Sequence, residues 1–372
     1  MKTRYIYYII LLNMISNVVA FVPLILIGER FDGAIMAILL GSILSTSIAM
    51  LFFKSVEVFP KQGVPEILQQ HVPFWLRTFF LIFLIPAWFF AGFVTIASYS
   101  DIVIRFMNPE MPEWEMTFLF VLIVIFLANS TTKQVLYILE IILVINVPLI
   151  VLIFIKGLTS PYMDWFAVRQ ILTYAWSWPS WEALSAATYI FTGYANMIIF
   201  HRVFTQSIPL KWFPVVGGIG LLNLATTFFM PIGYHGTIGV GSYIYPWVTT
   251  ADSIRMELGP VERMVFIFLL LYLSISLLST LIHWHVGLKL VESLISPSQE
   301  EKKKKRFQWM VLACFGAFTV IWDVFLNEVD LLRISIWWLS LRLPSEIIIV
   351  LLLYWISRKV KRHANTASSN GR

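Results

Sequence analysis

The sequence predicts an all-α polytopic membrane protein, and three observations carry this prediction. Hydrophobic residues make up 59% of the 372 residues, and only 13% are charged. This composition leaves too little polar surface to cover a water-soluble globule of this size. Apolar runs of about 20 residues, the length that crosses a bilayer as a helix, recur along the chain. These runs lack the two-residue alternation of a membrane β-barrel, so the spans are expected to be helices.

Ten apolar runs are interpreted as transmembrane helices. They lie near 5-27, 33-53, 78-104, 116-130, 135-155, 183-204, 212-232, 261-287, 308-326 and 336-357. An even number of spans places both termini on one side of the membrane. The expected organisation is one permease-like domain at 1-357, with spans one to five in about 5-155 and spans six to ten in about 183-357, followed by a basic cytoplasmic tail at 358-372.

The orientation follows from the distribution of Lys and Arg, which favour cytoplasmic loops. With the N-terminus and every second loop inside, 19 of the 27 basic residues are cytoplasmic and 8 are external. Both termini are therefore predicted to be cytoplasmic. The net charge of +6 reflects basic residues at 302-306 and 358-362, so topology explains it without nucleic acid. Contact of these residues with anionic lipid headgroups is the alternative.

Spans one and six carry polar interruptions at corresponding places. Span one contains MISNVVAFVP, with Ser16, Asn17 and Pro23 inside an apolar helix, and span six contains FTGYANM at 191-197. Glycine lowers helix propensity, and Thr and Asn side chains bond to backbone groups that an unwound turn sets free. Matching interruptions in the first helix of each half predict a five-plus-five inverted repeat with broken helices one and six. Packing of small polar residues between helices is the alternative.

Two stretches carry a resemblance to a known family. YPWVTTADSIRMELGPVERM combines an aromatic-Pro pair, Tyr245 and Pro246, with Glu262 and Arg263 at the opening of span eight, and NPEMPEW follows span three at 108-114. With the chain length, the ten spans and the basic tail, these stretches resemble the spore germination permease family, the B-type subunits of nutrient germinant receptors in endospore-forming bacteria. The resemblance covers essentially the whole chain.

The resemblance implies both a fold and a role. The family is similar to permeases of the amino acid/polyamine/organocation superfamily, which have a five-plus-five inverted repeat. It implies a multi-pass protein of the bacterial cell membrane or spore inner membrane that senses a small nutrient, usually an amino acid, together with an A-type membrane subunit and a C-type lipoprotein. This chain departs from the pattern in two places, because span one has no glycine at its break and Leu278 stands where many relatives have lysine.

A ligand site is expected between the two broken helices. Half-helix ends near the midplane offer free N–H groups to a carboxylate and free carbonyls to an ammonium group. The candidate residues are Thr192, Gly193, Tyr194 and Asn196 in span six, Ser16, Asn17 and Val18 in span one and, by the resemblance, Phe90, Phe93, Val94, Ser274 and Ser276 in spans three and eight. Positions two apart on a helix face different ways, so one of the two serines is expected to pack instead.

Charged residues within the spans are few. Glu140 in span five is a possible proton or cation site, because intramembrane acids are functional candidates by default, and a location near the cytoplasmic interface is the alternative. Arg342 and Glu346, four residues apart around Pro344, are expected to form a structural pair at the outer end of span ten.

Metal and catalytic chemistry find little support in the sequence. His283 and His285 point about 200° apart on a helix, and no Cys or acidic residue completes a ligand set with them. Cys314 is the only cysteine, so no intrachain disulfide is expected, and GTIGVGS lacks the Lys-Ser/Thr of a phosphate-binding loop. We therefore expect no metal, no cofactor and no enzymatic activity.

Three classes of function remain. A germinant-sensing receptor subunit is preferred, an active amino-acid transporter is the main alternative, and a purely structural membrane scaffold is the third. A sensor and a transporter need the same ligand site, so the sequence does not separate them. Uptake of radiolabelled amino acids into proteoliposomes would distinguish the first two classes, and a thermal-shift screen with amino acids would distinguish both from a scaffold.

Overall fold

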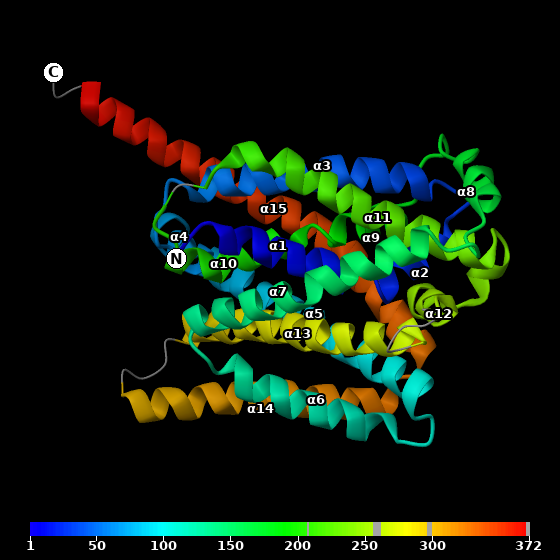
Figure 1. Cartoon of the computed structure of the whole chain (residues 1–372). Coiled ribbons are helices and arrows are strands. Elements are labelled where there is room, and N and C mark those ends of the chain that lie inside the picture. Colours follow the sequence, from blue (N-terminus) through cyan, green and yellow to red (C-terminus); the bar gives the residue numbers. More distant parts are fainter. Residues whose placement is uncertain (207, 256–261, 296–299, 370–372) are drawn as a thin grey trace.

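A computed structural model of the chain describes residues 1–206, 208–255, 262–295 and 300–369, with side chains described to residue 362. Within these residues the chain forms 15 α-helices and no strand. Long helices lie side by side, and both termini are at one end of the bundle (Figure 1). Two short helices, α8 (Trp165–Leu172) and α12 (Pro246–Ser253), lie at the opposite end. The prediction of an all-α fold is confirmed.

Span one is broken at the predicted place. It consists of α1 (Arg4–Ser16) and α2 (Phe21–Gly28), which are bent by 56° with respect to each other. The Asn17 side chain donates to the carbonyl oxygen of Asn13 at 2.8 Å, and the Asn17 N–H donates to the same oxygen. An amide side chain therefore takes part in ending α1 inside an otherwise apolar segment.

Span six is broken as well. It consists of α9 (Trp181–Tyr189), the 3-10 helix η1 (Thr192–Asn196), α10 (Met197–Phe200) and the 3-10 helix η2 (His201–Val203). The two parts, Trp181–Tyr189 and Thr192–Val203, are bent by 63°. The interruption FTGYANM thus marks the break, and the prediction that helices one and six are both broken is confirmed.

Among the described residues, seven unbroken helices are long and apolar enough to cross a membrane, and the two bent pairs bring the number to nine. The unbroken ones are α3 (Ala34–Val56), α5 (Phe74–Met107), α7 (Thr132–Leu158), α11 (Phe213–His235, with η3 at Leu210–Trp212 before it), α13 (Met264–Ile295), α14 (Glu301–Phe325) and α15 (Glu328–Ser369). The tenth predicted span corresponds to α6 (Glu113–Ala128), whose 16 residues measure about 24 Å, less than a typical hydrocarbon core. The count of ten spans therefore stays a prediction.

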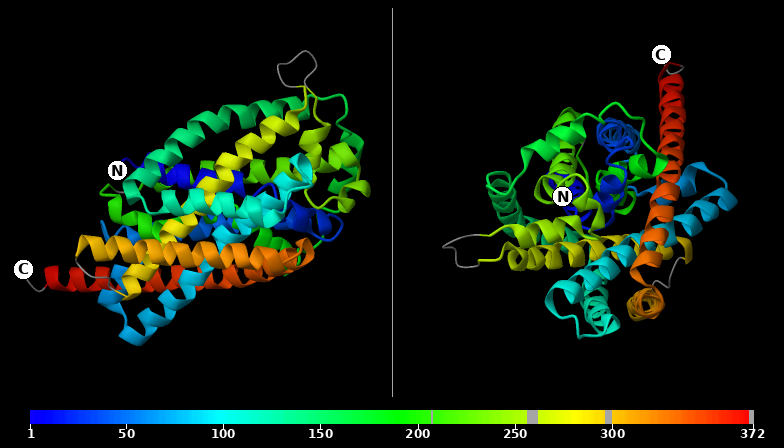
Figure 2. Two further views of the ribbon diagram at one scale, coloured as in Figure 1. Left: turned by 90° about the horizontal axis from the view of Figure 1, so that it is seen from below. Right: turned by 90° about the vertical axis from the view of Figure 1, so that its right-hand side faces the viewer.

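The remaining elements are short, namely α4 (Val64–His71) and the 3-10 helix η4 (Gly239–Ser242). Two basic segments expected outside the spans continue helices instead. Residues 302-306 lie in the first turns of α14, and the described part of the tail at 358-369 continues α15. The C-terminal end of α15 extends beyond the other helices in the views of Figures 1 and 2.

Close contacts between helices hold the bundle together. Gly92 of α5 faces the indole of the buried Trp284 on α13, so spans three and eight approach closely. On α15, Pro344 lacks the N–H that would bond to the carbonyl of Ser340. The indole N–H of Trp181, at the start of α9, donates to that carbonyl at 3.2 Å. The proline thus leaves an acceptor that joins α15 to span six.

Candidate functional site

A cavity of about 40 Å³ lies at the break of span one. We call it the outer cavity, because α2, which helps to line it, lies toward the end of the bundle that holds α12 (Figure 1). Its lining includes five hydroxyl-bearing residues and one amide: Ser16, Asn17, Thr95, Ser98, Ser276 and Ser335. Two tyrosines, Tyr99 and Tyr189, and the start of α2 complete the polar groups. None of the described residues that line it carries a charge.

The break of span one frees backbone groups beside this cavity. The carbonyl of Asn13 is bonded by Asn17 and also by the Ser16 hydroxyl at 3.3 Å, and the carbonyl of Met14 accepts from Asn223 of α11 at 3.0 Å. At the other side of the break, Ala20 forms no side-chain cap on α2. The first N–H groups of α2 are thus available to a polar ligand, and the helix dipole favours a negative charge there.

The break of span six is stabilised from span one. The Asn13 side-chain amide donates to the carbonyls of Tyr189 at 2.8 Å and Ile190 at 3.1 Å, and lies 3.2 Å from the Thr192 hydroxyl. Thr192 itself donates to the Tyr189 carbonyl at 2.8 Å. Carbonyls freed at the end of α9 therefore receive donors from both helices. These polar side chains hold the two breaks together, which accounts for their presence in apolar segments.

A second cavity, of about 70 Å³, lies on the other side of the span six break. We call it the inner cavity, because α10, which contributes Ile198 to its wall, lies near the N-terminus in Figure 1. Asn196 also lines it and accepts a hydrogen bond from the indole of Trp88 at 2.8 Å. Unlike the outer cavity, it is lined by charged residues, Arg342 and Glu346.

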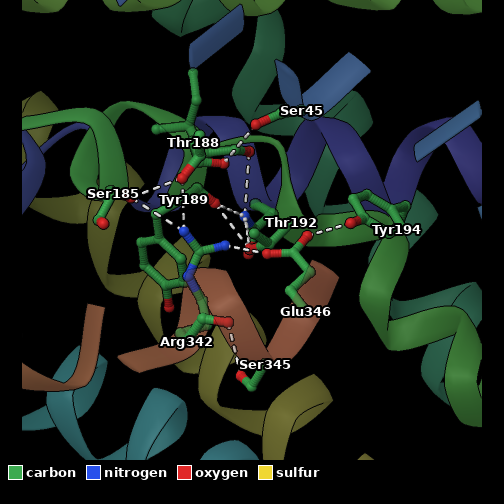
Figure 3. A network of polar contacts seen from close by, with 11 residues as sticks. Ser45, Ser185, Thr188, Tyr189, Thr192, Tyr194, Arg342, Ser345 and Glu346 are labelled. Carbon is green, nitrogen blue, oxygen red and sulfur yellow. Dashed lines mark hydrogen bonds and ion pairs between the residues drawn. The ribbon is translucent and has the colours of Figure 1, made fainter. Parts of the chain in front are cut away.

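The two charged residues form a network that joins α15 to both sides of the span six break (Figure 3). Arg342 pairs with Glu346 and donates to the Ser185 carbonyl at 3.0 Å and to the Thr188 hydroxyl at 2.7 Å, both on α9. Glu346 accepts the hydroxyl proton of Tyr194 in η1. One ion pair on α15 thus bonds to α9 on one side of the break and to η1 on the other.

An aromatic pair separates the two cavities. The rings of Tyr189 and Trp338 meet edge to face, with centroids 5.1 Å apart, and both residues line both cavities. Tyr189 is the last residue of α9, so this partition is built on the break itself.

The predicted site residues fall into three groups. Ser16, Asn17, Val94 and Ser276 line the outer cavity, and Thr192, Tyr194 and Asn196 line the inner cavity. Val18, Phe90, Gly193, Ser274 and Phe93 line neither of these cavities. Ser274 accepts from Asn146 of α7 at 2.9 Å and thus faces away from Ser276. Phe93 lines a smaller acidic cavity near the end of α14.

Gly193 lies in a close contact between the two broken helices. A Cβ atom there would lie 2.6 Å from both the Cα of Ile10 and the carbonyl oxygen of Ile9. Its φ is not in the left-handed region, since the positive-φ glycines of the described chain are Gly33 and Gly236. Glycine is therefore required for the approach of α1 rather than for an unusual backbone conformation.

Glu140 lies near one end of the bundle, in keeping with its alternative interpretation, whereas Arg342 and Glu346 form the expected pair at a different place. Glu140 pairs with Arg4 at 2.5 Å and accepts from Tyr5 at 2.5 Å, so it lies beside the start of α1. The Arg342 and Glu346 side chains are only 10% and 8% exposed. They lie in the middle of the bundle and not at the outer end of span ten, because the pair binds to the break of span six.

The two histidines have backbone partners. His283 lies 2.7 Å from the carbonyl of Ser279, and His285 lies 3.0 Å from that of Ala128 and 3.0 Å from the Thr132 hydroxyl. In the part of the chain that the structure describes, no group of three or more His, Cys, Asp or Glu side chains is arranged to hold a metal ion.

The acidic cavity contains four carboxylates, those of Asp101, Glu113, Asp323 and Glu328. Glu113 is the first residue of α6, before the predicted span at 116-130. Burial of Glu113, with the nearby negative charges of Asp323, Asp101 and Glu328, raises the pKa of its carboxyl to about 8. Glu113 is therefore expected to be mostly protonated at neutral pH.

Two broken helices around small central cavities define a permease-like membrane protein. The structure is similar to the crystal structure of MhsT in complex with L-phenylalanine, with a TM-score of 0.55 and 14% sequence identity, over 94% of this chain and 87% of that chain. At this level of identity the likeness shows the fold alone, so the chain has a LeuT-like fold.

The family follows from the sequence match. A family model described as spore germination protein matches residues 1–324, so the chain belongs to the spore germination protein family. No curated protein matches the sequence at a significant level. Fold and family together describe a multi-pass membrane protein of the spore germination protein family.

Several residues that form the cavities had no clear signal in the sequence. Trp338 lies among apolar residues of span ten, and Tyr189 precedes the FTGYANM interruption. Their contact joins positions far apart in the chain, and a single sequence holds no information on such pairs. Arg342, beside Pro344 in span ten, was singled out from the sequence, but as a structural residue and not as part of a cavity wall.

Proposed function

We propose that this protein is the nutrient-binding membrane subunit of a spore germinant receptor and binds a small amino acid in the outer cavity. The single observation that carries the proposal is the neutral, hydroxyl-lined cavity at the break of span one, beside the uncapped start of α2. Hydroxyl groups and free N–H groups suit a zwitterion, which brings no net charge into the membrane. The L-phenylalanine bound to MhsT gives a precedent for such a ligand on this fold.

The receptor role rests on the family. We propose that the chain resides in the spore inner membrane with both termini in the cytoplasm, acts with an A-type membrane subunit and a C-type lipoprotein, and catalyses no reaction. Co-purification of these two subunits with the tagged chain from spores tests the partnership.

Two serines of α13 provide a matched test of the ligand site. Ser276 lines the outer cavity, whereas Ser274 faces Asn146. Ser276→Ala is expected to weaken binding of L-alanine by about threefold to tenfold, the range for one hydrogen bond of about 0.5–1.5 kcal/mol. Ser274→Ala should leave the affinity unchanged. Equal affinities for both variants, measured by equilibrium dialysis of the purified protein, would remove the outer cavity as the ligand site.

Active transport is the second candidate, and the inner cavity favours it. A cavity on each side of the Tyr189–Trp338 pair is what a transported molecule would pass through in turn. Uptake of radiolabelled L-alanine into proteoliposomes distinguishes the two functions. Accumulation above that of empty liposomes would establish transport, whereas binding without uptake supports a sensor.

A further inference from the structure

Two residues that line the inner cavity each carry a buried donor without an acceptor. The indole Nε1 of Trp338 and the guanidinium Nε of Arg342 have no hydrogen-bond partner among the described residues. Trp338 is 7% exposed, and the Arg342 side chain is 10% exposed. The two residues are four apart on α15, so they lie on one face of the helix. Both line the inner cavity.

Leaving such donors unpaired is costly. A buried donor without an acceptor destabilises a protein by about 1–3 kcal/mol, and the cost is greater for a charged group. Two residues with unpaired donors line one cavity, which indicates that the ligand of that cavity supplies an acceptor. A carboxylate has two oxygens and suits two neighbouring N–H groups, one of which belongs to a guanidinium.

The charge of the site selects among carboxylate ligands. Arg342 and Glu346 already neutralise each other. A simple anion would therefore add an uncompensated charge within the membrane, which is expensive, whereas a zwitterion would add none. Glu346 accepts bonds from Arg342 and Tyr194, and a carboxylate has about four acceptor positions, so it can also receive an ammonium group.

Part of the remaining wall is apolar, beside polar residues such as Thr192, Asn196 and Ser345. Phe83, Leu84, Ile349 and Val350 lie on this cavity, and none of these side chains offers a polar atom. They suit a hydrophobic ligand side chain. The cavity volume of about 70 Å³ restricts this side chain to a small one.

We propose that the inner cavity is a second binding site, separate from the outer cavity, for a small apolar amino acid in its zwitterionic form. The ligand carboxylate accepts from Trp338 and Arg342, its ammonium group donates to Glu346, and its side chain packs on the apolar wall. This proposal rests on the proposed function only for the class of ligand, an amino acid. The contacts that it assigns are those of the inner cavity. Because Trp338 also lines the outer cavity, the two sites lie on either side of one indole ring.

The test counts binding sites on the purified full chain in lipid nanodiscs, by equilibrium dialysis with radiolabelled L-alanine and L-valine. We expect two sites per chain. Trp338→Phe keeps the ring against Tyr189 and removes only the N–H, so it should weaken one site by about threefold to tenfold. Glu346→Gln keeps an acceptor for Tyr194 but loses the charge, and it should abolish that same site. Ser276→Ala should affect the other site only.

Competition separates the ligand classes. Neither acetate nor ethylammonium alone should displace L-alanine from the inner site, because each lacks one of the two charges. One outcome would overturn the proposal of a second site: a single site per chain whose affinity changes in Ser276→Ala but not in Trp338→Phe or Glu346→Gln. The inner cavity would then hold only water, and the proposed function would stand. If two sites are found and Ser276→Ala changes the affinity of neither, the result would count against the outer cavity as a ligand site but not against the inner one. If Glu346→Gln does not fold, Trp338→Phe still decides.

Discussion

Gly193→Ala tests whether the contact between the two breaks is as tight as the structure shows. The added Cβ would lie 2.6 Å from two backbone atoms of α1, the Cα of Ile10 and the carbonyl oxygen of Ile9, and 2.9 Å from the Cβ of Asn13. Carbon atoms in contact are normally about 3.5–4.0 Å apart, so α1 must retreat by about 1 Å. Backbone atoms cannot rotate away as the end of a side chain can.

The expected cost follows from overpacking and from the bonds that the movement lengthens. Extra atoms in a well-packed interior cost about 1–3 kcal/mol. A retreat of α1 by about 1 Å also draws Asn13 away from the Tyr189 carbonyl, to which it now donates at 2.8 Å. We therefore expect Gly193→Ala to lower the free energy of unfolding by about 2–3 kcal/mol. Ligand affinity should fall as well, because both cavities adjoin these breaks.

Gly218→Ala is the matched control. Gly218 lies in α11, and a Cβ there would meet nothing within 4 Å. Alanine is the better helix former by about 1 kcal/mol, so this variant should be at least as stable as the original chain. Thermal unfolding of the three purified proteins in one detergent provides the comparison. If Gly193→Ala melts at the same temperature as Gly218→Ala, the close approach of α1 and η1 is wrong.

Three further predictions address charge, ligand contact and topology. The raised pKa of Glu113 favours its protonated form in the folded protein. The contribution of Glu113 to the free energy of unfolding should therefore be complete below about pH 4.5 and be lost as the pH rises through about 8. Glu113→Gln should remove this loss in thermal melts recorded across that pH range. Asn17→Leu should leave most of the protein folded but raise the half-maximal germinant concentration about tenfold, a loss of about 1.4 kcal/mol; an unchanged dose response at equal receptor abundance would contradict the contact. In a Cys314→Ser background, Ile238→Cys and Lys303→Cys should react with an impermeant thiol reagent from opposite sides of the membrane, and labelling of both from one side would break the predicted topology.

The helix breaks could be predicted because their cause is local. Ser16, Asn17 and the FTGYANM stretch are polar or flexible residues in apolar helices, and a membrane helix rarely carries such residues without a reason. The serine pair on α13 was equally local, since helix geometry alone requires Ser274 and Ser276 to face different ways. Whether either cavity holds a ligand stays a prediction.

Other features depended on contacts that span the chain. Nothing near Asn13 in the sequence indicates that its amide caps the end of α9, 176 positions away. Arg342 and Glu346 were expected at the outer end of span ten, but their partners Thr188 and Tyr194 place them at the centre of the bundle. The status of α6 as a span also stays open, because both the predicted run at 116-130 and the observed helix Glu113–Ala128 are shorter than a typical membrane span.

The length of the unbroken α15 would enlarge a small change in its tilt into a large displacement of its end. Beyond Pro344 it continues to Ser369, about 25 residues or roughly 38 Å of helix. A change of tilt of about 10° at the proline would therefore displace the far end by roughly 6 Å. Because Arg342 and Glu346 bond to both sides of the span six break, a rearrangement at the cavities would be magnified at the protruding end of α15.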